Sequence, residues 1–556
     1  MTNQTDEFVF LPLGGLGEIG MNAALYGFGP KAKRKWLMVD CGVAFAGPDL
    51  PGIDLIMPDI AFIEKIRKDL VGLIITHAHE DHIGAVADLW PRIGCKLYAT
   101  PFAAGLLATK RLSERGAPKV PVITVAQGDT IELGPFSVEF ISVAHSIPES
   151  CALAIRTTLG TVVHTGDWKI DETPMVGRPT DSARLAEIGR EGVLALVCDS
   201  TNILRDGVSP SETEVAATLA ELIKDAPGRV LITTFASNIA RIRAVALAAQ
   251  KCGRTVLVAG RAMDRSIAVA RECGYLDNIP PFLSADGFRH MPRSKVVVVA
   301  TGSQGEPRAA MARIAINEHP DVTLVPGDRV IFSSRPIPGN EKGINGVING
   351  LVDQGVEVIT DRNALVHVSG HPRRAEVSQM YDWVQPNIAI PAHGEGLHLA
   401  EHEAFALGKN VPHVIKAHNG DLVLLAPGKP GIVDEVQHGR MLKDGDLLVS
   451  PKDEAVQQRI KLSLAGIVTV AFAIDAKGHL AGDPDVVMAG LPARTRDGKG
   501  MDEIVDAAIF ETLDNLPRKK SRDADAASLA VERAVRSAVG HVWGKKPVVH
   551  VLVVEV

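Results

Sequence analysis

The chain has 556 residues, of which 46% are hydrophobic and 22% are charged. This composition is that of an ordinary globular protein of several domains, and it excludes a chain that is disordered or collagen-like in bulk. The formal net charge of -7 argues mildly against a nucleic-acid-binding protein, although the distribution of charge matters more than its total.

The ends and apolar runs of the chain indicate neither export nor membrane insertion. The first residues, MTNQTDEF, are polar and acidic, and the longest apolar runs, such as Val296–Ala300 and Val548–Val556, have the length of strands. A membrane-spanning helix needs about 20 apolar residues. The six cysteines are scattered, with no Cys-x-x-Cys pair, which is typical of a reducing compartment. We therefore predict a cytoplasmic protein without membrane contact.

Short apolar strands bounded by turn residues dominate the N-terminal part, with a helix expected at Ala61–Lys68. This pattern predicts sheets with helices on their outer faces. The strands are expected at Phe8–Leu13, Trp36–Val39, Leu73–Thr76, Val120–Val125, Ser137–Val143, Leu153–Thr157, Thr161–His164 and Leu194–Cys198.

The glycine motif Gly15–Gly20 matches the letters of a dinucleotide-binding fingerprint, G-x-G-x-x-G. In that fingerprint the last glycine opens a helix. Only Met21–Phe28 follow here before Gly29-Pro30, which is too short for a crossover helix. We therefore predict a hairpin with a glycine turn.

From about Ser209 strands alternate with helices, starting with a helix at Ser211–Leu222 for which Ser211 is the expected N-cap. This alternation predicts a parallel α/β sheet. Its strands are expected at Val230–Thr234, Thr255–Ala259, Lys295–Thr301 and Arg329–Ser333, and its helices near Ile239–Gln250 and Arg265–Arg271. Short strands return after about Val366, at Ile388–Ile390 and Leu422–Leu425, so one domain is inserted in another.

Gly428–Asp446 is rich in glycine, proline and charge and predicts a linker before a small C-terminal unit. In that unit we expect strands or hairpins at Ile460–Ile474, Val486–Met488 and Val548–Val554, and helices at Met501–Asn515 and Ala524–Trp543. The last strand is apolar on both faces and needs cover on both. Self-association through this unit is the prediction, and an ordinary central strand is the alternative.

The stretch Ala226–Ala310 contains 12 basic residues and 5 acidic residues, so it carries a charge of +7 on an otherwise acidic chain. A solvated basic face is one interpretation. A track for nucleic acid is the other, and Arg241 and Arg243 are its expected contacts.

The expected strand Leu73–Thr76 runs into the sequence His-Ala-His-Glu-Asp-His. Its candidate ligands are His77, His79, Asp81 and His82. Imidazole and carboxylate groups together suit Zn²⁺ and also Mn²⁺. Because alternate residues at a strand end share a face, His77 and His79 can bind one ion while Asp81 and His82 turn toward a second.

Three further candidates, His145, Asp167 and His393, also lie at strand ends, where each alone could have only a loop role. With the first cluster they make five histidines and two aspartates, which suffice for two adjacent ions with one bridging carboxylate. Two such ions clamp the attacking water and the leaving oxygen of a phosphoryl displacement.

This order of residues resembles the metallo-β-lactamase superfamily, whose signature is HxHxDH followed by a distant His, Asp and His. The resemblance implies that His77, His79 and His145 hold one ion and that Asp81, His82 and His393 hold the other. Asp167 would then bridge the two. Zinc is the metal we expect, with manganese as the alternative.

The long segment between Asp167 and His393 resembles the insertion of the β-CASP branch, which acts on nucleic acids. Within that branch the motifs are similar to those of the bacterial ribonuclease J family. They are Cys198–Asn202, Thr234–Ile239, Thr301–Pro307, Ser334–Glu341 and His367–His371.

The resemblance implies an α/β fold: an αββα metallo-β-lactamase sandwich, an inserted β-CASP α/β domain and a small C-terminal α/β domain. The first part of the sandwich is expected at residues 1–204 and its second part at 366–430. The insertion is expected at 205–365, the linker at 431–455 and the C-terminal domain at 456–556.

The resemblance also implies a metal-dependent ribonuclease with 5′→3′ exonuclease and endonuclease activity in RNA maturation and decay. Asp81, Asp199 and His371 are its expected catalytic residues. Ser237 and Asn238 would bind the 5′-monophosphate of single-stranded RNA. The substrate loop would comprise His367, Val368, Ser369, Gly370 and His371.

The family further implies a homodimer or homotetramer, with other RNA-decay proteins as further partners. A small-molecule metallo-hydrolase and a catalytically silent RNA-binding subunit are the alternatives. Some relatives bind a structural calcium, for which Asp49 and Asp444 are candidates here. Gly47 stands where a carboxylate would be wanted, so we expect no calcium site.

Overall fold

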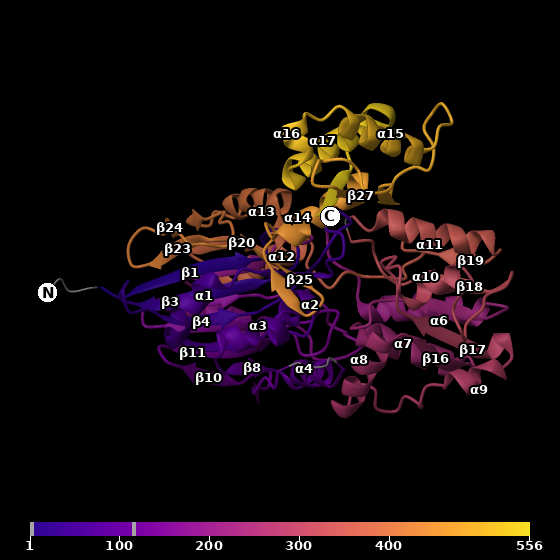
Figure 1. Cartoon of the computed structure of the whole chain (residues 1–556). Coiled ribbons are helices and arrows are strands. Elements are labelled where there is room, and N and C mark those ends of the chain that lie inside the picture. The colour runs from indigo at the N-terminus through magenta and orange to yellow at the C-terminus, as the bar shows by residue number, and fades with distance from the viewer. Residues whose placement is uncertain (1–4, 114–117, 338) are drawn as a thin grey trace. The chain divides into compact units, whose positions relative to one another are not determined.

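A computed structural model describes residues 5–113, 118–337 and 339–556, which divide into two compact units. The first unit comprises Met1–Ala44 and Met57–Gly439, and the second comprises Phe45–Ile56 and Arg440–Val556. Figure 1 follows the chain from indigo at its start to yellow at its end. Within the described ranges, none of the helices is both long and apolar enough to cross a membrane.

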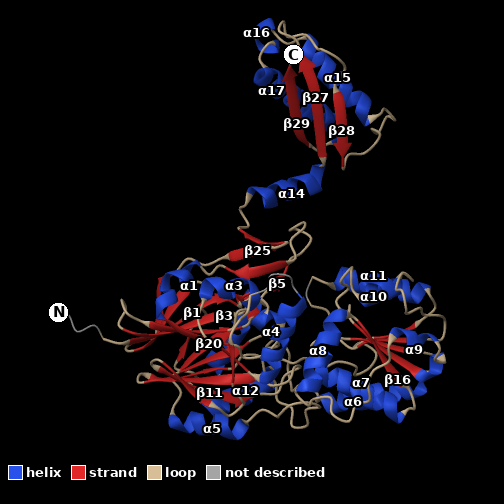
Figure 2. Ribbon diagram, turned by 60° about the horizontal axis from the view of Figure 1, so that its bottom comes forward, coloured by secondary structure: helices blue, strands red, loops and turns tan. Residues whose placement is uncertain are grey.

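Two β-sheets form much of the first unit (Figure 2). The first has the order β24 (Gly431–Glu435), β23 (Asp421–Ala426), β1 (Glu7–Gly14), β3 (Ala23–Gly29), β4 (Lys35–Val39), β7 (Leu70–Ile74), β8 (Leu97–Ala99) and β9 (Val122–Thr124). The second has the order β10 (Thr130–Leu133), β11 (Phe136–Ser142), β12 (Cys151–Thr157), β13 (Gly160–His164), β14 (Ala195–Asp199), β20 (Ile388–Ala392) and β22 (His413–Val414).

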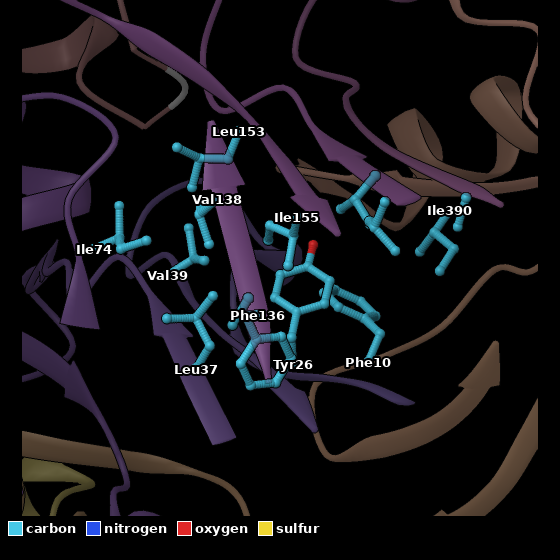
Figure 3. Packing of buried hydrophobic residues seen from close by; sticks show 14 of the residues in the cluster. Phe10, Tyr26, Leu37, Val39, Ile74, Phe136, Val138, Leu153, Ile155 and Ile390 are labelled. Atoms are coloured by element: carbon cyan, nitrogen blue, oxygen red, sulfur yellow. The ribbon is translucent and has the colours of Figure 1, made fainter. Parts of the chain in front are cut away.

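Aromatic and branched side chains fill the space between these sheets (Figure 3). Phe10 and Tyr26 come from the first sheet, and Phe136 and Ile155 come from the second; all four are fully buried. Burial of a large apolar side chain stabilises the fold by about 1.5–3 kcal/mol. This shared core fixes the two sheets against each other, and with them the loops at their edges.

Helices cover the outer face of each sheet, so the layers are helix, sheet, sheet and helix, as expected from the sequence. The ring of Phe62 in α1 (Ala61–Ile66) lies 5.4 Å from that of Trp36 in the first sheet. On the second sheet a separate apolar core forms under its helices. The helices of this part are α3 (Val86–Ile93), α4 (Pro101–Ser113), α5 (Ser182–Glu191), α12 (Arg374–Val384) and α13 (Gly396–Gly408).

The predicted parallel α/β sheet is confirmed, with the order β16 (Thr255–Ala259), β17 (Val296–Ala300), β15 (Val230–Thr233), β18 (Arg329–Phe332) and β19 (Glu357–Ile359). Its helices are α6 (Glu212–Asp225), α7 (Ile239–Lys251), α8 (Arg261–Glu272), α9 (Ala285–Arg289), α10 (Ala310–Ala315) and α11 (Glu341–Asp353). Ser211 caps α6 as expected, accepting the backbone N–H of Glu214 at 3.2 Å.

This α/β part is an insertion in the second sheet of the sandwich. The chain leaves that sheet after β14 and returns to it at β20, and these two strands pair in parallel, with Ala195 opposite Ile388. Figure 1 shows the orange strand β23 beside the indigo strand β1, with which it pairs. Segments that are distant in the sequence thus become neighbouring strands of one sheet.

The Gly15–Gly20 segment forms the hairpin that was expected. The strand β3 that follows pairs antiparallel with β1, and no helix opens after Gly20. Within the turn, β2 (Leu16–Gly17) pairs with β21 (Gly394–Glu395), directly after His393. The glycines therefore allow close backbone approach at this edge; Gly15 has φ +87°, a conformation that favours glycine.

The C-terminal part has a sheet of order β28 (Asp485–Ala489), β27 (Ile467–Ile474) and β29 (Val548–Glu555), packed on α15 (Met501–Asp514) and α17 (Ala524–Trp543). The prediction of a strand or hairpin across Ile460–Ile474 is wrong for its first residues, which end α14 (Glu454–Ala465). Gly466, with φ +66°, ends the helix before β27 begins. Other short elements are α16 (Arg518–Ser521), β5 (Ala44–Phe45), β6 (Leu55–Pro58), β25 (Arg440–Asp444) and β26 (Leu447–Val449).

The last strand, β29, is an edge strand of this sheet, so the alternative of a central strand is wrong. The helices cover only one of its faces: Val549 is buried in the core. On the other face Leu552 is 61% exposed and Val554 is 59% exposed. Val487 of β28, on the same face but across the central strand β27, is 63% exposed.

Candidate metal centre

The sequence His77–His82 runs from the tight loop after β7 into the short helix α2 (Glu80–Ile83), which contains Asp81 and His82. The segment after β4 holds this loop by backbone hydrogen bonds: the N–H of Cys41 donates to the carbonyl of His82 at 2.7 Å. Between them the backbones are so close that a Cβ on Gly42 would lie 1.7 Å from the carbonyl oxygen of Asp81. Glycine at this position is therefore required for the loop to adopt its shape.

Four side chains from three loops converge in a first cluster: His77, His79, His145 and Asp167. Nδ1 of His79 lies 3.1 Å from Nε2 of His77 and 3.0 Å from Nε2 of His145. The carboxylate of Asp167 lies 3.7 Å from each of these two Nε2 atoms.

A second cluster, Asp81, His82, Asp167 and His393, shares Asp167 with the first. Oδ1 of Asp167 lies 3.3 Å from Nε2 of His82 and 2.8 Å from Nδ1 of His393. Oδ2 of Asp81 lies 3.4 Å from Nε2 of His393. The two oxygens of Asp167 thus face different clusters. The structure brings together all seven residues that the sequence nominated as ligands.

The residues in these clusters fit divalent cations. Ring nitrogens face one another at about hydrogen-bond distance. Oδ1 of Asp167 and both ring nitrogens of His393 are buried, and although Oδ1 and Nδ1 lie 2.8 Å apart, none of these atoms makes a hydrogen bond of acceptable geometry with a described residue. Burial, and next the charge of His82, lowers the pKa of His77 well below its usual value. Neutral imidazole and ionised carboxylate are the forms that bind metals.

The shared carboxylate is ionised in this environment. Burial alone would raise the pKa of Asp167, but His393 and His82 hold it well below its usual range. A buried anion surrounded by imidazoles is the arrangement that a cation between them stabilises.

Outer partners fix the orientation of two of the imidazoles. Asp40 accepts from Nδ1 of His82 at 2.7 Å and from the backbone N–H of Thr76 at 2.8 Å. The carbonyl of Gly370 accepts from Nδ1 of His145 at 2.7 Å. Such partners fix the tautomer and raise the basicity of the coordinating nitrogen. The sequence pattern around Asp40 did not indicate this role.

A third group joins Asp167 and His393 to Asp199 and His371. Oδ2 of Asp199 accepts from Nδ1 of His371 at 2.8 Å. Burial opposes the charged imidazole, yet Asp199 raises the pKa of His371 above its usual value. The two predicted catalytic residues therefore form a pair beside the clusters.

The loop His367–His371 spans from this pair to the inserted domain. A Cβ on Gly370 would lie 2.5 Å from the ring of His145, so the loop can approach only through glycine. Val368 is buried. Burial, followed by the charges of Arg241 and Arg335, lowers the pKa of His367. His367 therefore faces the inserted domain, whereas His371 faces the clusters.

Ser237 and Asn238 directly precede α7, which begins at Ile239 as the sequence predicted. Asn238 is buried, and its Oδ1 accepts the backbone N–H of Arg241 at 2.9 Å. Asn238 is therefore the N-cap of α7. Pro338, within the Ser334–Glu341 motif, lies outside the described residues.

The placement of Arg241 in a nucleic-acid track is wrong. Its side chain is fully buried, and its guanidinium donates to Glu212 at 2.9 Å and to the carbonyl of Val366 at 2.7 Å. Arg243 donates to the carbonyl of Tyr275 at 2.9 Å. The count of charges along the sequence could not separate buried arginines from exposed ones.

Of the two candidate calcium ligands, Asp444 is paired with the guanidinium of Arg459, which approaches with two nitrogens. Neither Asp49 nor Asp444 belongs to a described cluster that could hold a metal. The expectation against a calcium site stays a prediction.

Imidazoles and carboxylates gathered at one edge of a two-sheet sandwich, with an α/β insertion, define a metal-dependent hydrolase of the metallo-β-lactamase superfamily. Residues 22–233 match the family described as Metallo-beta-lactamase superfamily. Residues 227–351 match Ribonuclease J, beta-CASP domain, and residues 454–556 match Ribonuclease J C-terminal domain.

The chain is 54% identical to Ribonuclease J of Sinorhizobium meliloti, over 100% of this chain and 98% of the relative. It is 38% identical to Ribonuclease J of Mycolicibacterium smegmatis, over 98% of this chain and 96% of the relative. The chain therefore belongs to the ribonuclease J family and is a metal-dependent ribonuclease, which sets aside the small-molecule hydrolase considered from the sequence.

Among solved structures, a protein of unknown function from Enterococcus faecalis V583 aligns with a TM-score of 0.53 at 16% identity. The alignment covers 75% of this chain and 100% of that chain. At this identity the likeness supports the fold alone.

The bond between Asp40 and His82 leads to a first prediction. Asp40→Asn should weaken the binding of one metal equivalent by about 10- to 100-fold, because the imidazole loses the carboxylate that orients it. Competition with a chromogenic chelator measures this. Asp69→Asn, which removes a carboxylate paired with Lys35 at the surface, is the matched control. Equal metal affinity in the two variants would contradict the role of Asp40.

Proposed function

We propose that the seven clustered residues hold two divalent ions, with zinc as the metal and manganese as the alternative, and that the enzyme degrades RNA 5′→3′ and also cleaves it internally. The observation that carries this proposal is the position of Asp167, whose two carboxylate oxygens face separate clusters. One ion would lie among His77, His79 and His145, and the other among Asp81, His82 and His393.

The bound ions would activate a water and neutralise the charge that develops on the phosphate. The residues of the chain supply orientation and proton transfer. His371, whose pKa Asp199 raises, is held ready to donate a proton to the leaving oxygen of the RNA chain. Asp81 and Asp167 fix the position of the attacking water relative to the phosphorus, in line with the leaving group.

Recognition of the 5′ end is assigned to the N-terminus of α7. The helix has 13 residues and begins at the carboxyl end of a parallel strand, where α/β sheets bind ligands. Free N–H groups at a helix N-terminus favour phosphate. Ser237 is half-buried and its hydroxyl can donate, while Asn238 orders the turn. This supports a preference for 5′-monophosphorylated RNA.

Self-association is assigned to the C-terminal domain. The uncovered face formed by Val487, Leu552 and Val554 is apolar, and β29 leaves one strand edge unpaired within the described sheet. Such surfaces mark protein interfaces. A homodimer or homotetramer that acts in the cytoplasm, together with other RNA-decay proteins, is the assembly we propose.

Removal of a ligand tests the metal assignment. His77→Ala or Asp81→Ala should lower cleavage by more than about 100-fold, since outer partners alone contribute about 10- to 100-fold. The double variant should be no worse than either single one, because the ligands act as a unit. The cleavage of labelled RNA and the metal content of each variant are both measured. His413→Ala, at an exposed histidine, is the control; wild-type cleavage by metal-stripped His77→Ala would contradict the assignment.

The 5′-phosphate pocket is tested by placing a charge in it. Ser237→Asp should lower kcat/KM for 5′-monophosphorylated RNA by at least about tenfold, or 1.4 kcal/mol, and change that for 5′-hydroxyl RNA much less. The helix itself gains from an anion at this end. Ser284→Asp, at the N-cap of α9 in the same domain, is the control. An equal loss on both RNAs would place the pocket elsewhere.

The assembly is tested by charging the uncovered face. Leu552→Glu with Val554→Glu should reduce the oligomer to monomers in analytical ultracentrifugation, because buried carboxylates would face each other in the interface. Leu464→Glu with Leu529→Glu, at exposed leucines on the helices of the same part, should leave it intact. An unchanged sedimentation coefficient in the first variant rejects this interface.

A further inference from the structure

Two loops carry arginines to the edge of the candidate metal centre. Asn202 forms a parallel β-bridge with Arg373, and the carbonyl of Arg205 accepts the N–H of the residue after Arg373 at 2.9 Å. The side chain of Asn202 donates to the hydroxyl of Ser369 at 2.9 Å and to the carbonyl of His371 at 3.1 Å. Both arginines are therefore tied by short connections to the loop that faces the clusters.

A third arginine reaches the same place from the inserted domain. Arg335 follows β18, and its carbonyl accepts the side-chain amide of Gln304 at 2.9 Å. Its side chain is 30% exposed and pairs with Asp361 at 3.2 Å. Its positive charge acts on His367, the first residue of the same loop. The loop is thus flanked by guanidinium groups from both domains.

The positive charges are only partly compensated. Within the described residues no carboxylate pairs with the guanidinium group of Arg205 or of Arg373. Desolvation lowers the pKa of Arg205, and repulsion by Arg335 and Arg373 lowers it further, with Asp361 opposing. Asp206, the residue after Arg205, does not compensate these charges, because its carboxylate lies 3.5 Å from the guanidinium of Arg374. The backbone segments of Arg205 and Arg373 are joined by a β-bridge and a hydrogen bond, and the charges of Arg335 and Arg373 both act on Arg205, with only Asp361 opposing them. This leaves a net positive site, and a bound anion would relieve the repulsion.

We propose that Arg205, Arg335 and Arg373 form an anion site that holds a phosphate of the RNA chain beside the phosphate that is cleaved. The planar guanidinium fork matches phosphate oxygens and makes bidentate, charge-assisted hydrogen bonds. Arg373 follows His371 by two residues, and Asn202, which pairs with Arg373, donates to the carbonyl of His371. A phosphate bound there would therefore belong to a nucleotide next to the scissile bond. This assignment rests on the proposed function, because that function places the scissile phosphate at His371.

The bound group is either an internal phosphodiester or the 5′-terminal monophosphate, since both present the same oxygens. The two sources are separated by using single-stranded RNA with a 5′-monophosphate and the same RNA with a 5′-hydroxyl. Equal weakening of both by a variant identifies an internal phosphodiester. Weakening of the 5′-monophosphate RNA alone identifies the terminal phosphate. Either result supports the site.

The test is the salt dependence of RNA binding by the full chain, measured by fluorescence anisotropy between 50 and 300 mM KCl with a chelator present to block cleavage. Arg205→Gln and Arg373→Gln should each reduce the slope of log affinity against log salt by about 0.7, and together by about 1.4. Arg205 has no ion-pair partner to lose, so that variant keeps the fold; circular dichroism checks this. Arg335→Gln tests the contribution of the inserted domain.

The matched control is Lys251→Gln, which makes the same change of charge in the inserted domain. Lys251 is exposed and ends α7, at the opposite end of that helix from the loop, about 18 Å away along the helix axis. If Arg205→Gln and Arg373→Gln bind with the affinity and slope of Lys251→Gln, the anion site is rejected. If the wild-type chain does not bind RNA here and does not cleave it when the chelator is omitted, the proposed function itself fails.

Discussion

The carboxylate of Asp167 is the group on which the arrangement of the site depends. It is buried, it is held ionised by His393 and His82, and each of its oxygens faces a different cluster of imidazoles. A buried anion without cations costs several kcal/mol. The sandwich accommodates it by bringing the ends of β7, β11, β13 and β20 to one edge, where the side chains that form ion pairs with Asp167 are histidines.

The inserted domain is coupled to this edge by buried charges. Arg241 pairs with Glu212, whose backbone N–H donates to Asp171 at 2.9 Å, and Asp171 pairs with Lys169 at 2.8 Å, two residues after Asp167. Removing one partner of such a buried pair costs about 3–5 kcal/mol. These contacts therefore fix the position of the segment that carries Ser237 and Asn238 relative to the segment that carries Asp167.

The seven candidate ligands could be predicted from the sequence because histidines and aspartates directly after apolar strands are costly without a purpose. Local rules also identified the cap at Ser211 and the helix Ala524–Trp543. What failed depended on tertiary contacts. Asp40 reaches His82 across 42 positions, and Arg241 reaches Val366 across 125; no local pattern encodes either bond. At Ile460 an apolar run was ambiguous between strand and helix, and Gly466 decided the boundary.

The central claim is that two metal ions share the carboxylate of Asp167. Anomalous diffraction from crystals of the metal-loaded enzyme, collected on both sides of the zinc and manganese absorption edges, tests it most directly and identifies the metal. The account predicts two anomalous peaks, one among His77, His79 and His145 and one among Asp81, His82 and His393, each beside one oxygen of Asp167. A single peak, or two peaks of which one is not in contact with Asp167, would contradict it.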